Sequence, residues 1–166
     1  MTHSELKEFL DEKVELYNKP NFIESDPIQI PHLYSAKEDI EIAGFLASTI
    51  AWGNRKMIIN NANKMMSLMG NSPYDFVMNF SENDLDNLDG FVHRTFNSDD
   101  LKVFLASLRH IYQNYGGLEN VFAEHQTSDS LQESISKFKQ TFFEIEHLPR
   151  TTKHVSDPLN NSAAKR

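Results

Sequence analysis

The stretch that decides the fold is residues 35–70, SAKEDIEIAGFLASTIAWG followed directly by NRKMIINNANKMMSLMG. It predicts two helices joined at Gly53 and Asn54. Ser35 and Glu38 have the spacing of a capping box, which marks the start of the first helix. The apolar residues of that helix recur at spacings of three and four and comprise Ile42, Phe45, Leu46 and Ile50. A helix that is apolar on most of its faces is expected to lie buried among other helices.

The second helix of the pair has its own apolar stripe, which comprises Met57, Ile58, Ala62, Met65, Met66 and Met69. Gly70 follows where a helix-ending glycine belongs, because glycine adopts the left-handed conformation without steric cost. In the first helix, we expect Phe45, Leu46 and Ile50 to be nearly fully buried.

Upstream of this pair, Thr2 and Glu5 form a second capping box, which predicts an amphipathic helix over residues 3–19 that ends at Pro20. The apolar face of that helix comprises Leu6, Phe9, Leu10, Val14 and Tyr17. Residues 21–34 contain two further prolines and no helical period, so we expect an extended segment there. Its apolar side chains, which we expect to pack on the helices, are Phe22, Ile28, Ile30 and Leu33.

Downstream, Ser72-Pro73 predicts the start of a short helix. The remaining predicted elements are one or two further turns over 81–88, an extended connection over 91–96, and helices over 98–115, 118–125 and 130–145. This pattern predicts an all-α, single-domain orthogonal bundle of roughly six to eight helices. Residues 1–147 would form the helical domain. Residues 148–166 would be a loose basic tail, poorly ordered or extended, or the start of a truncated second helical half.

The composition of the 166 residues is that of an acidic globular protein without cysteine, with 24 acidic and 16 basic side chains and a net charge of −8. The lack of cysteine excludes disulfides, cysteine zinc sites and a thiol nucleophile, and it fits a cytoplasmic location. The N-terminal residues have no apolar run of the kind found in signal peptides, and no window is apolar enough to span a membrane. We therefore expect a cytoplasmic protein that does not enter the membrane.

Basic residues are concentrated in two short segments of this acidic chain. Residues 53–70 carry three basic and no acidic side chains, and residues 148–166 carry four basic side chains and one acidic one. An acidic body does not favour general polyanion binding, but it leaves room for a local phosphate-binding edge.

The sequence lacks the common cofactor and metal motifs, including phosphate-binding glycine loops and histidine pairs at helical spacing. We therefore expect no cofactor and no metal. Asp99 and Asp100 stand together at a predicted helix start, where capping and the helix dipole account for them. No enzymatic activity follows from the motifs.

Candidate binding residues lie at the joint of the central helices, where Trp52 precedes Arg55 and Lys56. One interpretation is that the joint presents a ring and two cations to a nucleic acid or another anionic ligand. The alternative is a buried tryptophan followed by two solvated cations, and the pattern alone favours this alternative. His93 and Arg94 occupy a loop between apolar residues, and polar residues on a rigidly held loop are often functional.

The basic tail is a further candidate, with no aromatic residues between its basic ones: His147, Arg150, Lys153, His154, Lys165 and Arg166. An anion-binding edge and a solvated linker explain it equally well.

Four segments resemble one uncharacterised bacterial family, common in the Bacteroides lineage. They are IAGFLASTIAWGNRKMIINNANKMMSLMGNSPYDFV, FVHRTF, LRHIYQNYGGLENVF and HLPRTTKHVSDPLNNSAAKR, in the order of that family. Members are longer and continue into a second helical half, so the resemblance implies that this chain is an N-terminal fragment. The chain departs from the pattern at Asn161, where a glycine is common.

The full-length family is distantly similar to the helix-hairpin-helix DNA glycosylases, and residues 42–58 resemble a helix and turn that those enzymes place against DNA. The hairpin and the catalytic aspartate of that superfamily would fall at or beyond Arg166, so no catalytic residue is carried over. The resemblance implies a DNA-interacting protein of glycosylase-like fold, truncated before its catalytic half. The alternative is a non-enzymatic helical module that binds another protein. Convergence of Trp52, Arg55, Arg94 and the basic tail on one exposed face would favour DNA.

Overall fold

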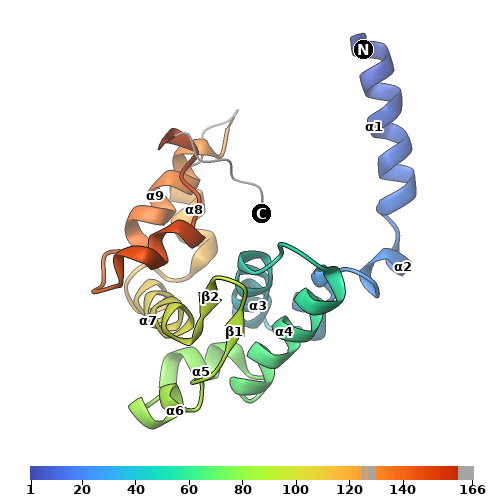
Figure 1. Ribbon diagram of the computed structural model, residues 1–166. Coiled ribbons are helices and arrows are strands. Elements are labelled where there is room, and N and C mark those ends of the chain that lie inside the picture. Colours follow the sequence, from blue (N-terminus) through green and yellow to red (C-terminus); the bar gives the residue numbers. More distant parts are fainter. Residues whose placement is uncertain (125, 127–129, 161–166) are drawn as a thin grey trace.

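The computed structural model describes residues 1–124, 126 and 130–160, and it confirms the all-α prediction. The α-helices in the described residues are α1 (His3–Tyr17), α2 (Pro20–Ile23), α3 (Lys37–Thr49), α4 (Arg55–Leu68), α5 (Pro73–Asn79), α6 (Glu82–Asp86), α7 (Ser98–Asn114), α8 (Leu118–Glu124) and α9 (Gln132–Phe142). Short 3-10 helices are η1 (Pro27–Gln29), η2 (Pro31–Leu33), η3 (Pro149–His154) and η4 (Pro158–Asn160). One small hairpin joins β1 (Val92–His93) to β2 (Phe96–Asn97) (Figure 1).

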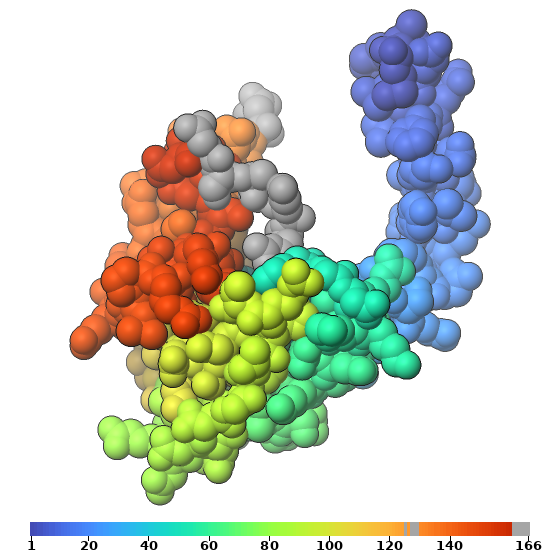
Figure 2. Space-filling model, viewed as in Figure 1, coloured from blue at the N-terminus to red at the C-terminus, as the bar shows by residue number. Residues whose placement is uncertain are grey.

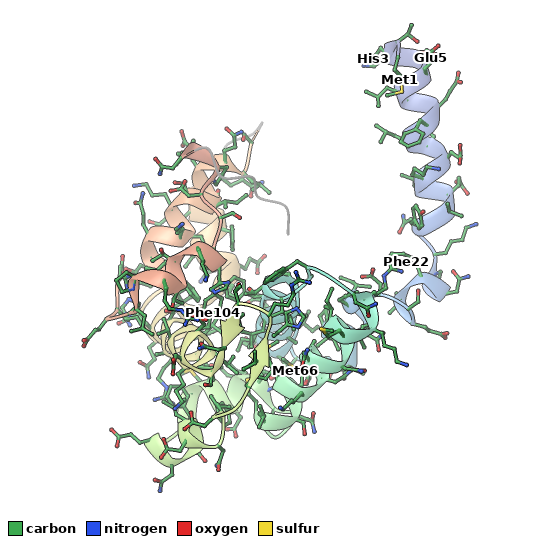
Figure 3. All side chains as sticks on the ribbon, in the orientation of Figure 1. Met1, His3, Glu5, Phe22, Met66 and Phe104 are labelled. Carbon is green, nitrogen blue, oxygen red and sulfur yellow. The ribbon has the colours of Figure 1, made fainter. Side chains whose placement is uncertain are left out.

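The central helix α3 lies in the core, as predicted, and Leu46 and Ile50 are fully buried. The same expectation was wrong for Phe45, which is only partly buried because one side of its ring lines a cavity of about 240 Å³. Its ring also lies against other aromatic rings, with the Phe104 ring stacked at 5.6 Å between centroids. Figure 3 places Phe104 and Met66 inside the body of the molecule.

The start of α3 differs from the predicted capping box of Ser35 and Glu38. The N-cap is Ala36, and no side chain caps the helix. Instead, the first-turn residue Asp39 accepts a hydrogen bond of 2.9 Å from the backbone N–H of Tyr74, at the start of α5. Asp39 therefore caps the N-terminus of α5, where the N-cap Ser72 makes no side-chain hydrogen bond, and does not cap its own helix.

Helix α4 begins where the sequence indicated, because the Asn54 side chain accepts a hydrogen bond from the Met57 N–H at 3.1 Å. Its stripe is buried except for Met57, which is 49% exposed, contrary to the prediction. The first turn of the helix projects beyond the core, so Ile58 is its first buried residue. Gly70 ends the helix with φ 64°, as expected of a glycine at that position.

The N-terminal helix α1 has the predicted capping box of Thr2 and Glu5, but none of its residues is buried. Figures 1 and 2 show it standing apart from the rest of the protein. The segment after it is compact, not extended, because Pro20, Pro27 and Pro31 each begin a short helix. Of its apolar residues Ile30 is buried, Phe22 is partly buried, and Ile28 and Leu33 are exposed.

The segment after His147 corrects the prediction of a loose tail. Residues 149–160 include η3 and η4, and Thr151, His154 and Val155 are buried. An apolar stripe is not needed there, because Arg150 and Thr151 of η3 donate hydrogen bonds to the buried carboxylate of Asp100 in α7. A domain boundary at residue 147 stays a prediction, and the helix start predicted at residues 161–166 lies outside the described residues.

Among the described helices, none combines the length and apolar character that a membrane crossing requires.

Candidate functional site

The site is built around the β1–β2 hairpin, in the stretch predicted to be an extended connection. Val92 pairs with Asn97 and His93 with Phe96, so a single six-residue stretch supplies both strands. Two residues form the turn, Arg94 and Thr95. The prediction of an extended connection was wrong here, because the same short segment supplies both strands of the hairpin.

Arg94 occupies the left-handed region at the first turn position, with φ 57°. A two-residue hairpin turn with positive φ at its first position normally has glycine there, because a β-carbon is strained in that conformation. In this turn conformation the guanidinium lies over the ring of Trp52, 4.6 Å from its centroid. The Arg94 side chain also passes close to Gly53, where an added β-carbon would lie 3.0 Å from Nη1.

Gly53 precedes Asn54, the N-cap of α4, so the Arg94 guanidinium lies at the N-terminal end of that helix. The first backbone N–H groups of a helix have no partner within it, and they give this end a partial positive charge. Arg94 is exposed and makes no ion pair with any described residue. The joint of α3 and α4 therefore presents a preorganised cation beside a helix N-terminus.

His93 is buried, with 1% of its surface exposed, so it lies under this corner and not on the surface where the sequence placed it. Asn61 of α4 donates to Nδ1 at 3.0 Å, which leaves Nε2–H to donate to the Trp52 carbonyl at 3.4 Å. Burial is the main cause that lowers the pKa of His93 below 6.5, and the hydrogen bond to Trp52 opposes that shift in part. The neutral ring links the hairpin to α4 and to the joint between the central helices.

Arg55 and Lys56 point to different surroundings. Arg55 lies 3.8 Å from Asp26 and over the Phe22 ring, so it faces the N-terminal segment. Lys56 is exposed in the first turn of α4 and makes no ion pair with a described residue. Lys56 therefore remains available for an anion, whereas the charge of Arg55 is partly satisfied.

On the other side of the hairpin lies a buried carboxylate, Asp100 of α7. It accepts hydrogen bonds from Thr151 Oγ1 at 2.7 Å and from Arg150 Nη2 at 2.5 Å. His154 Nε2 lies 3.4 Å away. Burial alone would raise the pKa of Asp100, but hydrogen bonds from Thr151, the Asn97 backbone and Arg150 outweigh it and hold the pKa below 3.8.

Arg150 also donates to the Thr95 carbonyl at 3.3 Å, which brings it next to Arg94 along the hairpin turn. The sequence analysis identified Arg150 as a candidate binding residue. It did not predict that Asp100 and Thr151 belong to the same cluster or that His154 is buried there. A helix-start capping box explained Asp100 locally, and that box is present with Asn97. No sequence signal paired it with residues fifty positions away.

The structure thus brings four predicted residues together, Trp52, His93, Arg94 and Arg150. Arg55 faces Asp26, and Lys153 is exposed without a described ion-pair partner. Lys165 and Arg166 lie outside the described residues.

The fold and site define an all-α protein with a cationic hairpin corner beside its central helix joint. The sequence model of one family, described as a protein of unknown function (DUF2400), matches residues 26–166. The chain belongs to that family. Helices α1 and α2 lie outside the matched segment. No curated protein and no solved structure matches the chain.

Proposed function

We propose that this protein binds the phosphate backbone of DNA at the corner where Arg94 meets the N-terminus of α4. The observation that supports this most is the strained, exposed Arg94 stacked on Trp52. Backbone strain is retained where the surrounding structure enforces it, and such strain is concentrated at functional sites. Helix N-termini bind phosphate through free N–H groups, and arginine recognises phosphate with a planar fork of donors.

Lys56 extends this corner by one further cation, and the resemblance of the central stretch to DNA glycosylases supports DNA as the polyanion. His93 anchors the hairpin to Asn61 and Trp52 beneath it. On the other side of the hairpin, Arg150 is paired with Asp100 and donates to the Thr95 carbonyl. We assign the direct phosphate contacts to Arg94 and Lys56, with Arg150 held mainly by Asp100. Catalysis is not part of the proposal.

The net charge of −8 opposes this binding, because the acidic surface repels DNA at long range. We therefore expect weak, non-specific binding that depends on salt. The phosphate contacts of Arg94 and Lys56 must overcome the repulsion between DNA and the acidic surface. Salt at 0.1 M screens that repulsion beyond about 10 Å.

The experiment is a fluorescence anisotropy titration of a labelled DNA duplex at low ionic strength. Arg94→Ala/Lys56→Ala should weaken binding about tenfold, the loss expected for two exposed charge contacts. The matched control is Lys137→Ala on α9, which removes an exposed cation elsewhere and should leave affinity unchanged. Absence of wild-type binding, or equal affinity of the double variant and wild type, would contradict the proposal.

A protein-binding role is the second candidate, and one observation favours it. Helix α1 exposes its whole apolar face.

A further inference from the structure

We infer that His93 is a positioning residue for the phosphate-binding corner, and that it holds Arg94 in place only while its imidazole ring is neutral. Acidification should therefore open the corner and release the anion. The identity of that anion, a DNA phosphate, rests on the proposed function. The hydrogen bonds, the burial and the charges around His93 do not depend on it.

The hydrogen bonds of His93 fix the protonation state of its ring. Nε2 lies 3.4 Å from the Trp52 carbonyl, which only accepts hydrogen bonds, so Nε2 carries a proton. Nδ1 lies 3.0 Å from the side-chain nitrogen of Asn61, which only donates, so Nδ1 is the unprotonated acceptor. A second proton on the ring would place two N–H donors against each other at Nδ1.

Burial also opposes a charge on this ring, since His93 is 1% exposed. Burial is the largest cause that lowers its pKa, and the neighbouring guanidinium of Arg94 lowers it further, against backbone hydrogen bonds at Trp52 and Ile50. Rotating the Asn61 amide would remove the clash of donors at Nδ1. It would still leave an imidazolium buried with no carboxylate in ion-pair contact among the described residues.

The other charged groups around the hairpin do not compensate such a cation. Lys64 of α4 lies over the ring of Phe91, the residue before β1. Arg150 of η3 reaches the hairpin turn and is paired with the carboxylate of Asp100. His154, a further titratable group on this side, lies 3.4 Å from the same carboxylate. A positive charge under the hairpin would therefore add to cations that surround it.

The ring of His93 is connected to both residues that shape the phosphate site. It precedes Arg94, whose φ of 57° defines the turn, and it donates to the carbonyl of Trp52, whose ring lies under the guanidinium. Loss of these hydrogen bonds would free the turn from the joint of α3 and α4. The guanidinium would then lose its fixed place at the N-terminus of α4, and with it the preorganisation of the phosphate contact.

The sign of the pH effect separates this mechanism from general electrostatics. Lowering the pH makes an acidic protein less negative, which by itself strengthens binding to DNA. The contribution of His93 has the opposite sign. It is fully present above pH 6.5 and is lost as the pH falls through the lower pKa of the folded state.

The first test uses no DNA. Acrylamide quenching of Trp52, the one tryptophan of the sequence, measures access to the indole under Arg94. Access should rise between about pH 7.5 and about pH 5 in wild type but not in His93→Gln, which keeps a donor and does not titrate. The matched control, His110→Gln, removes the histidine paired with Glu144 and should behave like wild type. Access that is constant in wild type, or that rises equally in His93→Gln, would overturn the inference.

A second variant tests the partner of His93. Asn61→Asp replaces the donor to Nδ1 by a carboxylate, which accepts from the protonated ring and favours it. Trp52 should then stay protected at about pH 5, although the ring is charged. The matched control is Asn63→Asp at an exposed position of the same helix, where acid should open the corner as in wild type. Equal acid-induced access in Asn61→Asp and wild type would contradict the role of Nδ1.

The DNA readout is the anisotropy of a labelled duplex over the same pH range at constant ionic strength. Wild-type affinity should fall about threefold on acidification, the loss expected for one exposed charge contact, whereas His93→Gln should lose none. An affinity that rises equally in both proteins would overturn the assignment of His93 as a positioning residue for the phosphate contact. Absence of binding at every pH would instead contradict the proposed function, and the quenching of Trp52 would decide the role of His93.

Discussion

Arg150 Nη2 lies 2.5 Å from Asp100 Oδ2, although fifty residues separate them in the sequence. The carboxylate is completely buried, and the arginine side chain is 43% exposed. The same arginine donates to the Thr95 carbonyl, so the carboxylate, the η3 segment and the hairpin turn form one connected unit. Loss of Asp100 should therefore loosen both η3 and the turn that presents Arg94.

Asp100→Ala should lower the free energy of unfolding by about 2–3 kcal/mol, because Thr151 loses its buried acceptor and Arg150 its ion-pair partner. Urea unfolding followed by circular dichroism measures the change. The control is Asp99→Ala, which removes an exposed carboxylate from the same helix turn and should cost about 0.5 kcal/mol. Equal effects of the two substitutions would show that Asp100 acts only through the helix dipole.

The pH dependence of folding stability should also show the contribution of Asp100. The pKa of Asp100 is lower in the folded state than its ordinary value of 3.8. Its contribution is therefore fully present above pH 3.8 and is lost as the pH falls through the folded-state pKa. Arg150→Ala should move that loss to higher pH. Superimposable acid-unfolding curves for Arg150→Ala and wild type would contradict this.

The central helices could be predicted from the sequence because their signals are local. The 3.6-residue period of α3, the Asn54 cap and Gly70 each act within one or two turns. The hairpin and the Asp100 cluster could not be predicted, since they depend on contacts between segments distant in the chain. A two-residue strand is defined only by its pairing with another strand. A carboxylate at a helix start is explained by capping whether or not an arginine elsewhere in the chain binds it.

The candidate site was predictable only as separate residues. Trp52 and Arg94 were identified individually, but their stacking depends on a turn conformation that arginine rarely adopts. Arg55 looked equivalent to Lys56 in the sequence. The structure separates them through Asp26, which lies in a segment predicted to be extended.

The strain at Arg94 predicts an order of stability among its variants. Arg94→Gly relieves about 1 kcal/mol of left-handed strain and loses about 0.5–1 kcal/mol of stacking on Trp52, so its stability should stay close to wild type. Arg94→Ala keeps the strain and loses the stacking, so it should be about 1 kcal/mol less stable than Arg94→Gly. Thermal unfolding compares the two. An alanine variant as stable as the glycine variant would contradict the claim that the backbone at Arg94 is strained.

The core assignment predicts that Leu46→Ala lowers the free energy of unfolding by about 2–5 kcal/mol, because Leu46 is fully buried in the central helix. Met57→Ala on α4 is the control, since Met57 is half exposed and should cost less than about 1 kcal/mol. Denaturant midpoints give both values. An unchanged midpoint for Leu46→Ala would remove α3 from the centre of the fold.

The most direct test of the proposed DNA-binding corner is the salt dependence of duplex binding, measured for wild type and Arg94→Gly. Each phosphate that a cation neutralises contributes about −0.9 to the slope of log affinity against log salt. Contacts from Arg94 and Lys56 predict a wild-type slope of about −2 and a slope of about −1 for Arg94→Gly. Because Arg94→Gly should keep its stability, a change in slope reports the lost contact and not unfolding. Identical slopes for the two proteins would contradict the assignment of Arg94 as a phosphate contact.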